Sequence, residues 1–180
     1  AHAAVTGSGK AATQTREASG LAARSHRGGI DVGVRQGARE AVQVTADDNL
    51  LPLLQTTVEG SGDQRTLVIQ WQRGDSIRTR TKTVVTVDVV KLTALASSGS
   101  GDIVVEALKT PALALSISGS SDAKVSGLDA EQLRVAITGS GDVQASGRAA
   151  RFNLSIAGSG DVRARELVAD DVDISIAGSG

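Results

Sequence analysis

The second half of the chain alternates apolar and polar residues with a period of two, which is typical of β-strands that bury one face. Four such stretches each run into a glycine-rich turn, and a shorter alternation follows the turns. The apolar positions of the four stretches are Leu113, Leu115 and Ile117; Leu133, Val135 and Ile137; Phe152, Leu154 and Ile156; and Val172, Ile174 and Ile176. The pattern therefore predicts short strands joined by turns.

A Gly-Ser-(Gly or Ser)-Asp box forms each turn, at intervals of 20, 20, 19 and 20 residues. The boxes are Gly99 to Asp102, Gly119 to Asp122, Gly139 to Asp142 and Gly158 to Asp161, and Gly178 opens a fifth. One such unit cannot bury its own apolar face, because about six aliphatic side chains at ~2 kcal/mol each do not offset ~1.5 kcal/mol of ordering entropy per residue. Stacking supplies the missing burial. The repeat predicts an all-β fold, a right-handed parallel β-helix (β-solenoid) with coils of about 20 residues.

Two other repeat folds fit this pattern less well. A leucine-rich repeat has a similar period, but its Leu-x-x-Leu-x-Leu motif is absent, and calcium-binding nonapeptide repeats have a period of nine. In the solenoid, a further apolar column is predicted at Leu108, Leu128 and Leu167, with Arg148 interrupting it.

The sequence predicts one domain over residues 1–180, with regular coils over 91–180. Residues 1–90 lack the boxes but are rich in strand patterns, so we expect irregular coils or a cap that covers the first open edge. The chain stops inside the fifth box, which predicts a truncated C-terminal end that is open to self-association or to another chain. Ala1-His2-Ala3 has the small-x-small form of a signal-peptidase tail and predicts an exported protein.

Composition excludes several classes of partner and site. The net charge is −1, and Trp71 and Phe152 are the only aromatic residues, so neither a basic surface for nucleic acid nor a stacking platform is expected. No cysteine is present, which excludes disulfides and cysteine-based zinc sites. No run of 18 apolar residues predicts a membrane span.

Several sequence features together resemble the putative autotransporter adhesin, head GIN domain family. They are the boxes at 20-residue spacing, the segment Asp47 to Leu51 followed by Val58 and Leu67 to Ile69, and the opening Gly7 to Gly9 with Arg16 nearby. The resemblance implies a right-handed β-helix exported to the periplasm, cell envelope or exterior of a bacterium, with an adhesin-like role and no catalytic residues. Ser121 departs from the box, and further coils of the family kind are missing beyond Gly180.

The aspartates of the boxes should stack in one column, where like charges about 5 Å apart repel. They are Asp102, Asp122, Asp142 and Asp161. One interpretation is that each caps its own turn by accepting backbone N–H bonds, with glycine supplying a positive φ. The other is a metal site in which the carboxylates bind Ca²⁺, the only cofactor that the sequence suggests. Ser121 then either is strained or belongs to a different turn.

A second group of candidate residues is basic. Arg78, Arg80 and Lys82 alternate, so on one strand they would share a face and could bind an anionic glycan or lipid headgroup. A charged edge strand is the alternative. Arg73-Gly74-Asp75 spells an integrin-attachment tripeptide, although composition alone produces such a match by chance in about one of eight chains.

Catalytic motifs are missing. His2 and His26 are the only histidines, no Gly-x-Ser-x-Gly elbow occurs, and the spacing of Ser121 and Lys124 resembles a β-lactamase dyad without its companion motifs. We expect a non-catalytic, exported, adhesin-like interaction module of unknown ligand, with an envelope or extracellular glycan or protein as partner. The alternatives are a Ca²⁺-dependent polysaccharide lyase-like enzyme on a β-helix and a purely structural envelope spacer.

Overall fold

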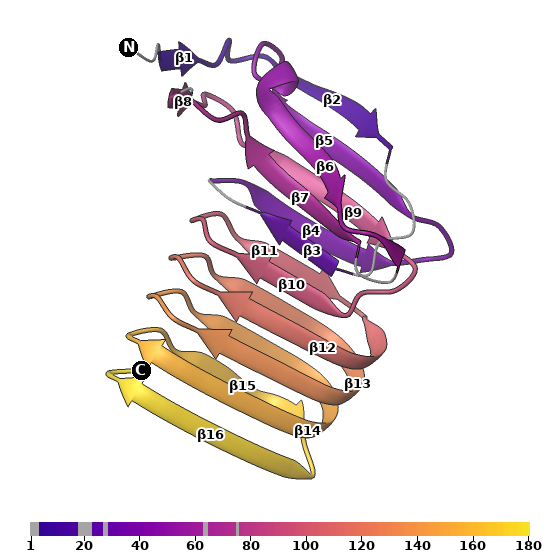
Figure 1. Cartoon of the computed structure of the whole chain (residues 1–180), viewed down its shortest axis with the longest axis vertical. Helices are drawn as coiled ribbons and strands as arrows, with labels where there is room; N and C mark the ends of the chain where they lie inside the picture. The colour runs from indigo at the N-terminus through magenta and orange to yellow at the C-terminus, as the bar shows by residue number, and fades with distance from the viewer. Residues whose placement is uncertain (1–3, 18–22, 27–28, 63–64, 75) are drawn as a thin grey trace.

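The computed structural model describes residues 4–17, 23–26, 29–62, 65–74 and 76–180, and it forms an all-β solenoid of about four turns (Figure 1). The coils are flattened, so the strands form two faces. The first face carries, in spatial order, β2 (Ala11–Arg16), β5 (Ala41–Asp47), β9 (Val84–Val89), β4 (Asp31–Gln36), β11 (Ile103–Glu106), the first parts of β13 (Ala123–Ile137) and β14 (Val143–Gly158), and β15 (Val162–Val168). The predicted β-solenoid is confirmed.

The second face continues the same sheet around the corner, because β13 and β14 bend and contribute to both faces. It carries β6 (Leu54–Glu59), β7 (Thr66–Trp71), β3 (Ala23–His26), β10 (Ala94–Ser97), β12 (Lys109–Ile117), the later parts of β13 and β14, and β16 (Asp171–Gly178). The remaining elements are a parallel pair, β1 (Ala4–Thr6) with β8 (Ser76–Arg78), and the 3-10 turn η1 (Leu51–Leu53).

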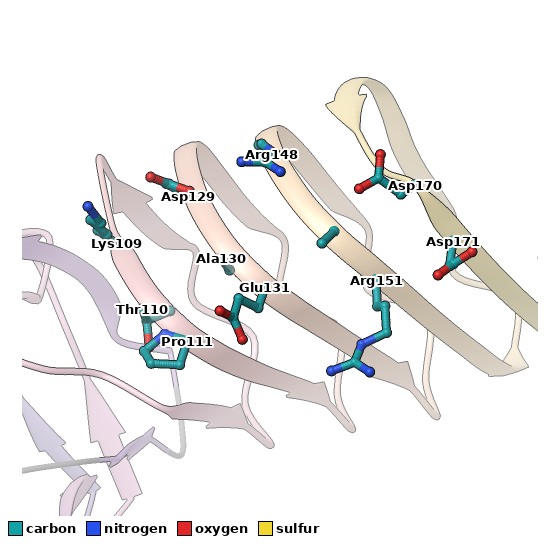
Figure 2. A pocket seen from close by; sticks show the side chains of 11 residues that line it. Lys109, Thr110, Pro111, Asp129, Ala130, Glu131, Arg148, Arg151, Asp170 and Asp171 are labelled. Atoms are coloured by element: carbon teal, nitrogen blue, oxygen red, sulfur yellow. The ribbon is translucent and has the colours of Figure 1, made fainter.

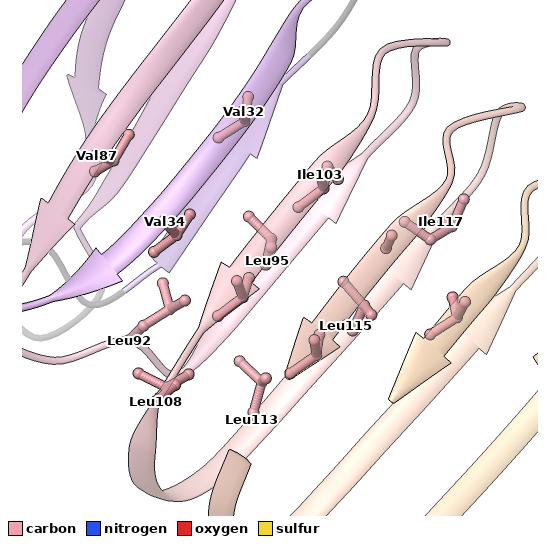
Figure 3. Close-up of a cluster of buried hydrophobic side chains, with 14 of the residues drawn as sticks. Val32, Val34, Val87, Leu92, Leu95, Ile103, Leu108, Leu113, Leu115 and Ile117 are labelled. Carbon is pink, nitrogen blue, oxygen red and sulfur yellow. The ribbon is translucent and has the colours of Figure 1, made fainter. Parts of the chain in front are cut away.

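The core lies between the faces and consists of aliphatic columns that run along the solenoid axis (Figure 3). Ile117, Ile137 and Ile156 are in register on successive coils and are buried. The strands of each coil hydrogen-bond to the next coil about 4.8 Å away, so equivalent side chains stack directly. The predicted alternation is thereby confirmed for the first three stretches, whose apolar residues are buried, whereas Val172, Ile174 and Ile176 of the fourth are exposed.

The 19-residue coil is accommodated at the corner opposite the boxes. The register shifts between Val125 and Leu128, so that Leu128 pairs with Gly147 rather than with Arg148. The prediction that Arg148 interrupts the leucine column was therefore wrong: Gly147 occupies that position, and Arg148 pairs with Asp129. A bulge of this kind absorbs one residue without moving the strands on either side.

The box glycines are required mainly by close approach, which corrects the expectation that they supply a positive φ. The φ of Gly139 lies outside the left-handed region, but a Cβ there would lie 2.3 Å from the carbonyl oxygen of Gly119 in the preceding coil. Gly158 (φ 151°) and Gly178 (φ 124°) do have positive φ. The first box position thus has no room for a side chain whether or not its backbone is left-handed.

Ser121 replaces a box glycine with a backbone that is not left-handed, and Ser97 supplies a side-chain partner for it. In the next coil, a Cβ at Gly141 would lie 2.0 Å from the carbonyl oxygen of Ser121 and 2.9 Å from Cγ2 of Ile117. The residue that precedes Ile117 in its column is Ser97, which leaves room for Ser121, and the two hydroxyl groups are 2.9 Å apart. The Ser121 hydroxyl also donates to the carbonyl oxygen of Gly99 (3.0 Å). The prediction of a left-handed Ser121 was wrong, because its φ is not positive; that its turn differs from those of the glycine boxes stays a prediction.

The N-terminal end of the solenoid is covered by antiparallel strands, with β2 against β5 on the first face and β6 against β7 on the second. Asp47, at the end of β5, is buried and accepts backbone N–H bonds from Gly9 (3.0 Å), Arg80 (3.1 Å) and Thr81 (3.2 Å). Asn49 binds the same N-terminal segment by accepting from the N–H of Ser8 (2.8 Å). The family-like segments around Gly7 and Asp47 therefore contact each other and hold the first residues on the cap.

The Asp47 contacts predict a pH dependence of stability. Burial raises the pKa of this carboxyl, but the N–H bonds from Thr81, Gly9 and Arg80 outweigh that effect and leave the pKa below the ordinary value of 3.8. A folded-state pKa below the unfolded one stabilises the protein above about pH 4, and this contribution is lost as the pH falls through the folded-state pKa. We expect Asp47→Asn to lower the free energy of unfolding at pH 7 and to flatten its decline between pH 5 and pH 3. Urea unfolding at several pH values measures both, and parallel profiles for the two proteins would contradict the assignment.

Candidate functional site

The box aspartates form a ladder along one edge of the first face, and the carboxylates of Asp122 and Asp142 reach the following coil. The N–H of Asp142 donates to Oδ1 of Asp122 (3.0 Å), and the N–H of Asp161 donates to Oδ1 of Asp142 (3.0 Å). In the same way, the N–H of Asp102 donates to Oδ1 of Asp31 (2.8 Å). For Asp122 and Asp142, the expectation that the carboxylate caps its own turn was therefore wrong, because both accept from a backbone N–H of the next coil.

Asp31 belongs to this ladder and was missed by the sequence analysis. It is the first residue of β4, whereas the box aspartates lie directly before their strands. The segment Gly29-Ile30-Asp31-Val32 resembles a box only in its glycine and its aspartate. Its other carboxylate oxygen lies 3.3 Å from Nζ of Lys82. The sequence signal for Asp31 was weak, because its box-like segment has no serine. Asp31 also lies 71 residues before Asp102, its neighbour in the ladder.

The ladder aspartates of the boxes are exposed, and the N–H bonds together with solvent reduce their mutual repulsion. Among the residues that the structure describes, no three His, Asp or Glu side chains gather closely enough to hold a metal ion. Binding of Ca²⁺ by the ladder stays a prediction; carboxylate oxygens are suitable ligands, but side chains would have to converge on one ion.

Beside the ladder runs a trough in the first face. A hollow of about 280 Å³ lies between the aspartates and the outward side chains of Val104, Lys124, Gln144 and Arg163. Lys124, Gln144 and Arg163 also line a second hollow, of about 870 Å³, which lies towards β15. Val104 also lines a third hollow, of about 320 Å³, which lies at Gly33. We call the three together the first-face trough.

The trough crosses the strands of successive coils, so it extends along the solenoid axis. The trough is hollowed along its centre because Gly33 has no side chain and the side chains of Val104 and Gln144 are of moderate length. One wall is acidic, and hydroxyl groups of Ser126 and Ser146 lie on the other side. Hydrogen-bond donors and acceptors therefore recur at about 4.8 Å per coil, which suits an extended polar ligand.

The candidate basic residues do not share one strand, which corrects the prediction that they project from one face. Strand β8 ends at Arg78, the chain bends at Arg80, and β9 begins only at Val84. The backbone N–H of Arg80 is held by Asp47, and Lys82 contacts Asp31. Arg73 is an exposed turn residue, and Asp75 of its tripeptide lies outside the described residues. A ligand-binding role for Arg73, Arg78, Arg80 and Lys82 stays a prediction.

A second groove, of about 690 Å³, lies at the corner opposite the boxes (Figure 2). Lys109, Asp129 and Arg148 follow one another on successive coils, so the sign of the charge alternates along the axis. Glu131, Arg151, Asp170 and Asp171 add further charges nearby (Figure 2). Opposite charges on neighbouring coils attract each other, so the charges along this column have a structural role without a ligand. The first-face trough is the better candidate site.

Comparison with known proteins agrees with this fold. The putative auto-transporter adhesin, head GIN domain family matches residues 25–180. None of the curated proteins matches the chain. No helix in the described part of the chain has the length and apolar character needed to cross a bilayer.

Several solved structures have the same fold. A putative adhesin from Bacteroides fragilis is 23% identical with a TM-score of 0.89, and the match covers 97% of this chain and 79% of that one. A putative adhesin from Parabacteroides distasonis is 26% identical with a TM-score of 0.74, covering 98% and 82%. A structure called a putative lipid binding protein, from the same species, is 20% identical with a TM-score of 0.78, covering 98% and 83%. With its repeat, its fold and this match over most of its length, the chain belongs to the putative auto-transporter adhesin, head GIN domain family.

Proposed function

We propose that this protein is a non-catalytic, exported binding module that holds an extended polar ligand, such as an envelope or extracellular glycan, in the first-face trough. The observation that carries the proposal is the continuity of the trough across successive coils, with an aspartate in each coil and a basic side chain in alternate coils. A linear polymer that lies along the solenoid axis would meet a carboxylate in every coil and a cation in every second one. The adhesin-like family supports a binding role outside the cell.

The carboxylates and cations of the trough suit hydroxyl-rich ligands. Asp122 lies two residues before Lys124, and Asp161 two residues before Arg163, so each pair projects from the same side of its strand. A vicinal diol can donate to the carboxylate and accept from the cation at the same time. No aromatic side chain lines the trough, so recognition would depend on polar contacts and would be weak per coil.

Thermal melting against defined glycans tests the proposal. The probes are alginate oligosaccharides for an anionic ligand and chitin and mannan oligosaccharides for neutral ones, each with Ca²⁺ or with a chelator. A ligand at about 100 times its Kd stabilises the fold by ~2.7 kcal/mol, which raises the melting temperature measurably. We expect a shift with one glycan class.

A matched pair of charge variants locates the binding. Lys124→Glu with Arg163→Glu alters the trough, whereas Arg134→Glu with Arg151→Glu makes the same change of charge on the second face. The shift should disappear in the first variant and remain in the second. Equal loss in both would place the effect in overall charge, and no shift with any probe would favour the structural spacer.

The same mixtures test the two remaining alternatives. A product that absorbs in the ultraviolet, from an unsaturated sugar, would establish a polysaccharide lyase instead of a binding module. A shift with Ca²⁺ alone, lost on changing Asp122 and Asp142 to asparagine, would make the ladder a metal site.

A further inference from the structure

Gly33 lies in the middle of β4, where neither the backbone nor the packing requires a glycine. Its strand pairs without a bulge with Thr86 of β9 on one side and with Val104 of β11 on the other (Figure 1). Its φ lies outside the left-handed region, and among the described residues a Cβ here would have no atom within 4 Å apart from its chain neighbours. A strand glycine without such a reason lowers stability, and it is typical of a place that a ligand approaches closely.

The missing side chain leaves a hollow of about 320 Å³, the third hollow of the first-face trough. Val32 and Val34 are buried in the core, so Gly33 between them faces outward. Val104, the neighbour of Gly33 in the next coil, forms an apolar wall and is 37% exposed. The hollow therefore combines an open backbone floor with an apolar side.

Three polar side chains of the hollow are free to contact a ligand. They are Gln43, Thr86 and Glu106, and in the part of the chain that the structure describes their side chains make no hydrogen bond or ion pair. Arg35 also lines the hollow but is held by Asp88, with Nε and Nη2 both 3.1 Å from Oδ1. The hollow thus offers an amide, a hydroxyl and a carboxylate.

The strand register places these groups on opposite sides of the glycine. Thr86 lies beside Gly33 on β9, and Gln43 lies one strand further, on β5. Val104 lies on the other side, and Glu106 follows it two residues later on the same face of β11. Because neighbouring strands are about 4.8 Å apart, the hydroxyl side and the apolar side are separated by about 10 Å. This gap can admit one sugar ring with its substituents.

We propose that this hollow, which we call the Gly33 subsite, binds the acetamido group of an N-acetylamino sugar. The proposal rests on the proposed function, because the subsite belongs to the trough that would hold the glycan. An acetamido group combines a methyl group, an N–H donor and a carbonyl acceptor. The methyl group packs against Val104, the N–H donates to Glu106, and the carbonyl oxygen accepts from Thr86 or Gln43.

A hydroxyl group in place of the acetamido group would match the Gly33 subsite poorly. It has no methyl group to cover Val104, and it cannot reach the carboxylate of Glu106 and the groups on β9 at the same time. Polar groups that a ligand covers without pairing them weaken binding, so a site of this kind rejects an analogue that lacks their partners. We expect N-acetylated glycans to bind at least tenfold more tightly than glycans with hydroxyl groups at the same positions.

Gly33→Val tests the Gly33 subsite, because its two expected effects have opposite signs. The new side chain fills the hollow, so the affinity for chitin oligosaccharides, measured by titration calorimetry, should fall at least tenfold. The melting temperature should stay the same or rise by about 1 to 4 °C, since valine suits a strand and loses less chain entropy than glycine.

Gly37→Val is the matched control for this variant. The φ of Gly37 is also outside the left-handed region, and among the described residues a Cβ there has no atom within 4 Å apart from its chain neighbours. Gly37 does not line the hollow, so chitin binding should be retained.

Chitin and cellulose oligosaccharides of equal length are a matched pair of probes, because they differ only in the acetamido or hydroxyl group at C2 of each sugar. We expect cellulose to bind at least tenfold more weakly than chitin. Val104→Thr exchanges one methyl group for a hydroxyl in a side chain of the same shape, and it should weaken chitin binding several-fold.

The outcomes separate this proposal from the proposed function. Equal binding of the two oligosaccharides, or chitin binding that survives Gly33→Val, would overturn the Gly33 subsite and leave the trough as a glycan site. A shift with alginate or mannan but not with chitin would do the same. A lower melting temperature of Gly33→Val would also overturn it, since the fold itself would then require the glycine. No shift with chitin, alginate or mannan would contradict both proposals.

Discussion

Replacing Gly139 with valine is expected to lower the free energy of unfolding by about 3 kcal/mol or more, with a melting temperature lower by roughly 6 to 12 °C for a domain of this size. The Cβ would lie 2.3 Å from the carbonyl oxygen of Gly119, and that oxygen is part of the neighbouring coil's backbone. The neighbouring group cannot rotate away as a side chain would. Relief requires the two coils to separate, which breaks their hydrogen bonds and opens the core beneath them.

Two control variants separate close approach from backbone conformation. Ser140→Val changes the adjacent, exposed box residue and should stay within about 0.5 kcal/mol of the wild type. Gly62→Ala tests a glycine with a φ of 60° and no atom near its Cβ position, so its cost should come from conformation alone, about 1 kcal/mol. Chemical unfolding of the three variants gives the comparison. A Gly139→Val protein as stable as Ser140→Val would show that the coils are not this close.

Replacing Ser97 with isoleucine is expected to destabilise the protein by about 1 to 3 kcal/mol, even though isoleucine occupies the same column in the following coils. Elsewhere that isoleucine packs against a box glycine, as Ile117 does against Gly141. Ser97 instead packs against Ser121. Ser121 is fully buried and would contact the larger isoleucine side chain at position 97. The variant also removes the Ser97 hydroxyl from the buried pair.

The second substitution of the pair should restore stability. Ser97→Ile with Ser121→Gly recreates the isoleucine and glycine combination of the other coils, so we expect it to recover most of the lost stability. Ser121→Gly alone should cost about 1 kcal/mol through the lost hydrogen bonds. Equilibrium unfolding of all four proteins forms a double-mutant cycle. Additive effects, with the double variant less stable than Ser97→Ile, would mean that the two positions do not compete for space.

The trough follows from the repeat of the solenoid. It extends along the axis because each coil contributes an outward side chain at the same position, so its length scales with the number of coils. The chemistry differs from coil to coil, because this position is held by Val104, Lys124, Gln144 and Arg163 in turn.

The sequence by itself determined the solenoid, because its evidence is periodic. Alternation identified the strands, the boxes identified the turns, and a unit too small to bury its own residues required stacking. The inward residues, among them Ile117 and Ile137, followed from parity alone. The ladder aspartates of the boxes followed from the repeat in the same way.

The tertiary structure determined whatever depends on contacts between coils. Local spacing shows neither that a carboxylate such as that of Asp122 reaches the next coil nor that a glycine such as Gly139 is required by a neighbouring carbonyl. The bulge that places Gly147 under the leucine column, and the pairing of Ser97 with Ser121 at a separation of 24 residues, are also contacts of this kind. The physical reason is common to all of them: a repeat specifies which residues are equivalent, but the space and partners at each position are set by the adjacent coil.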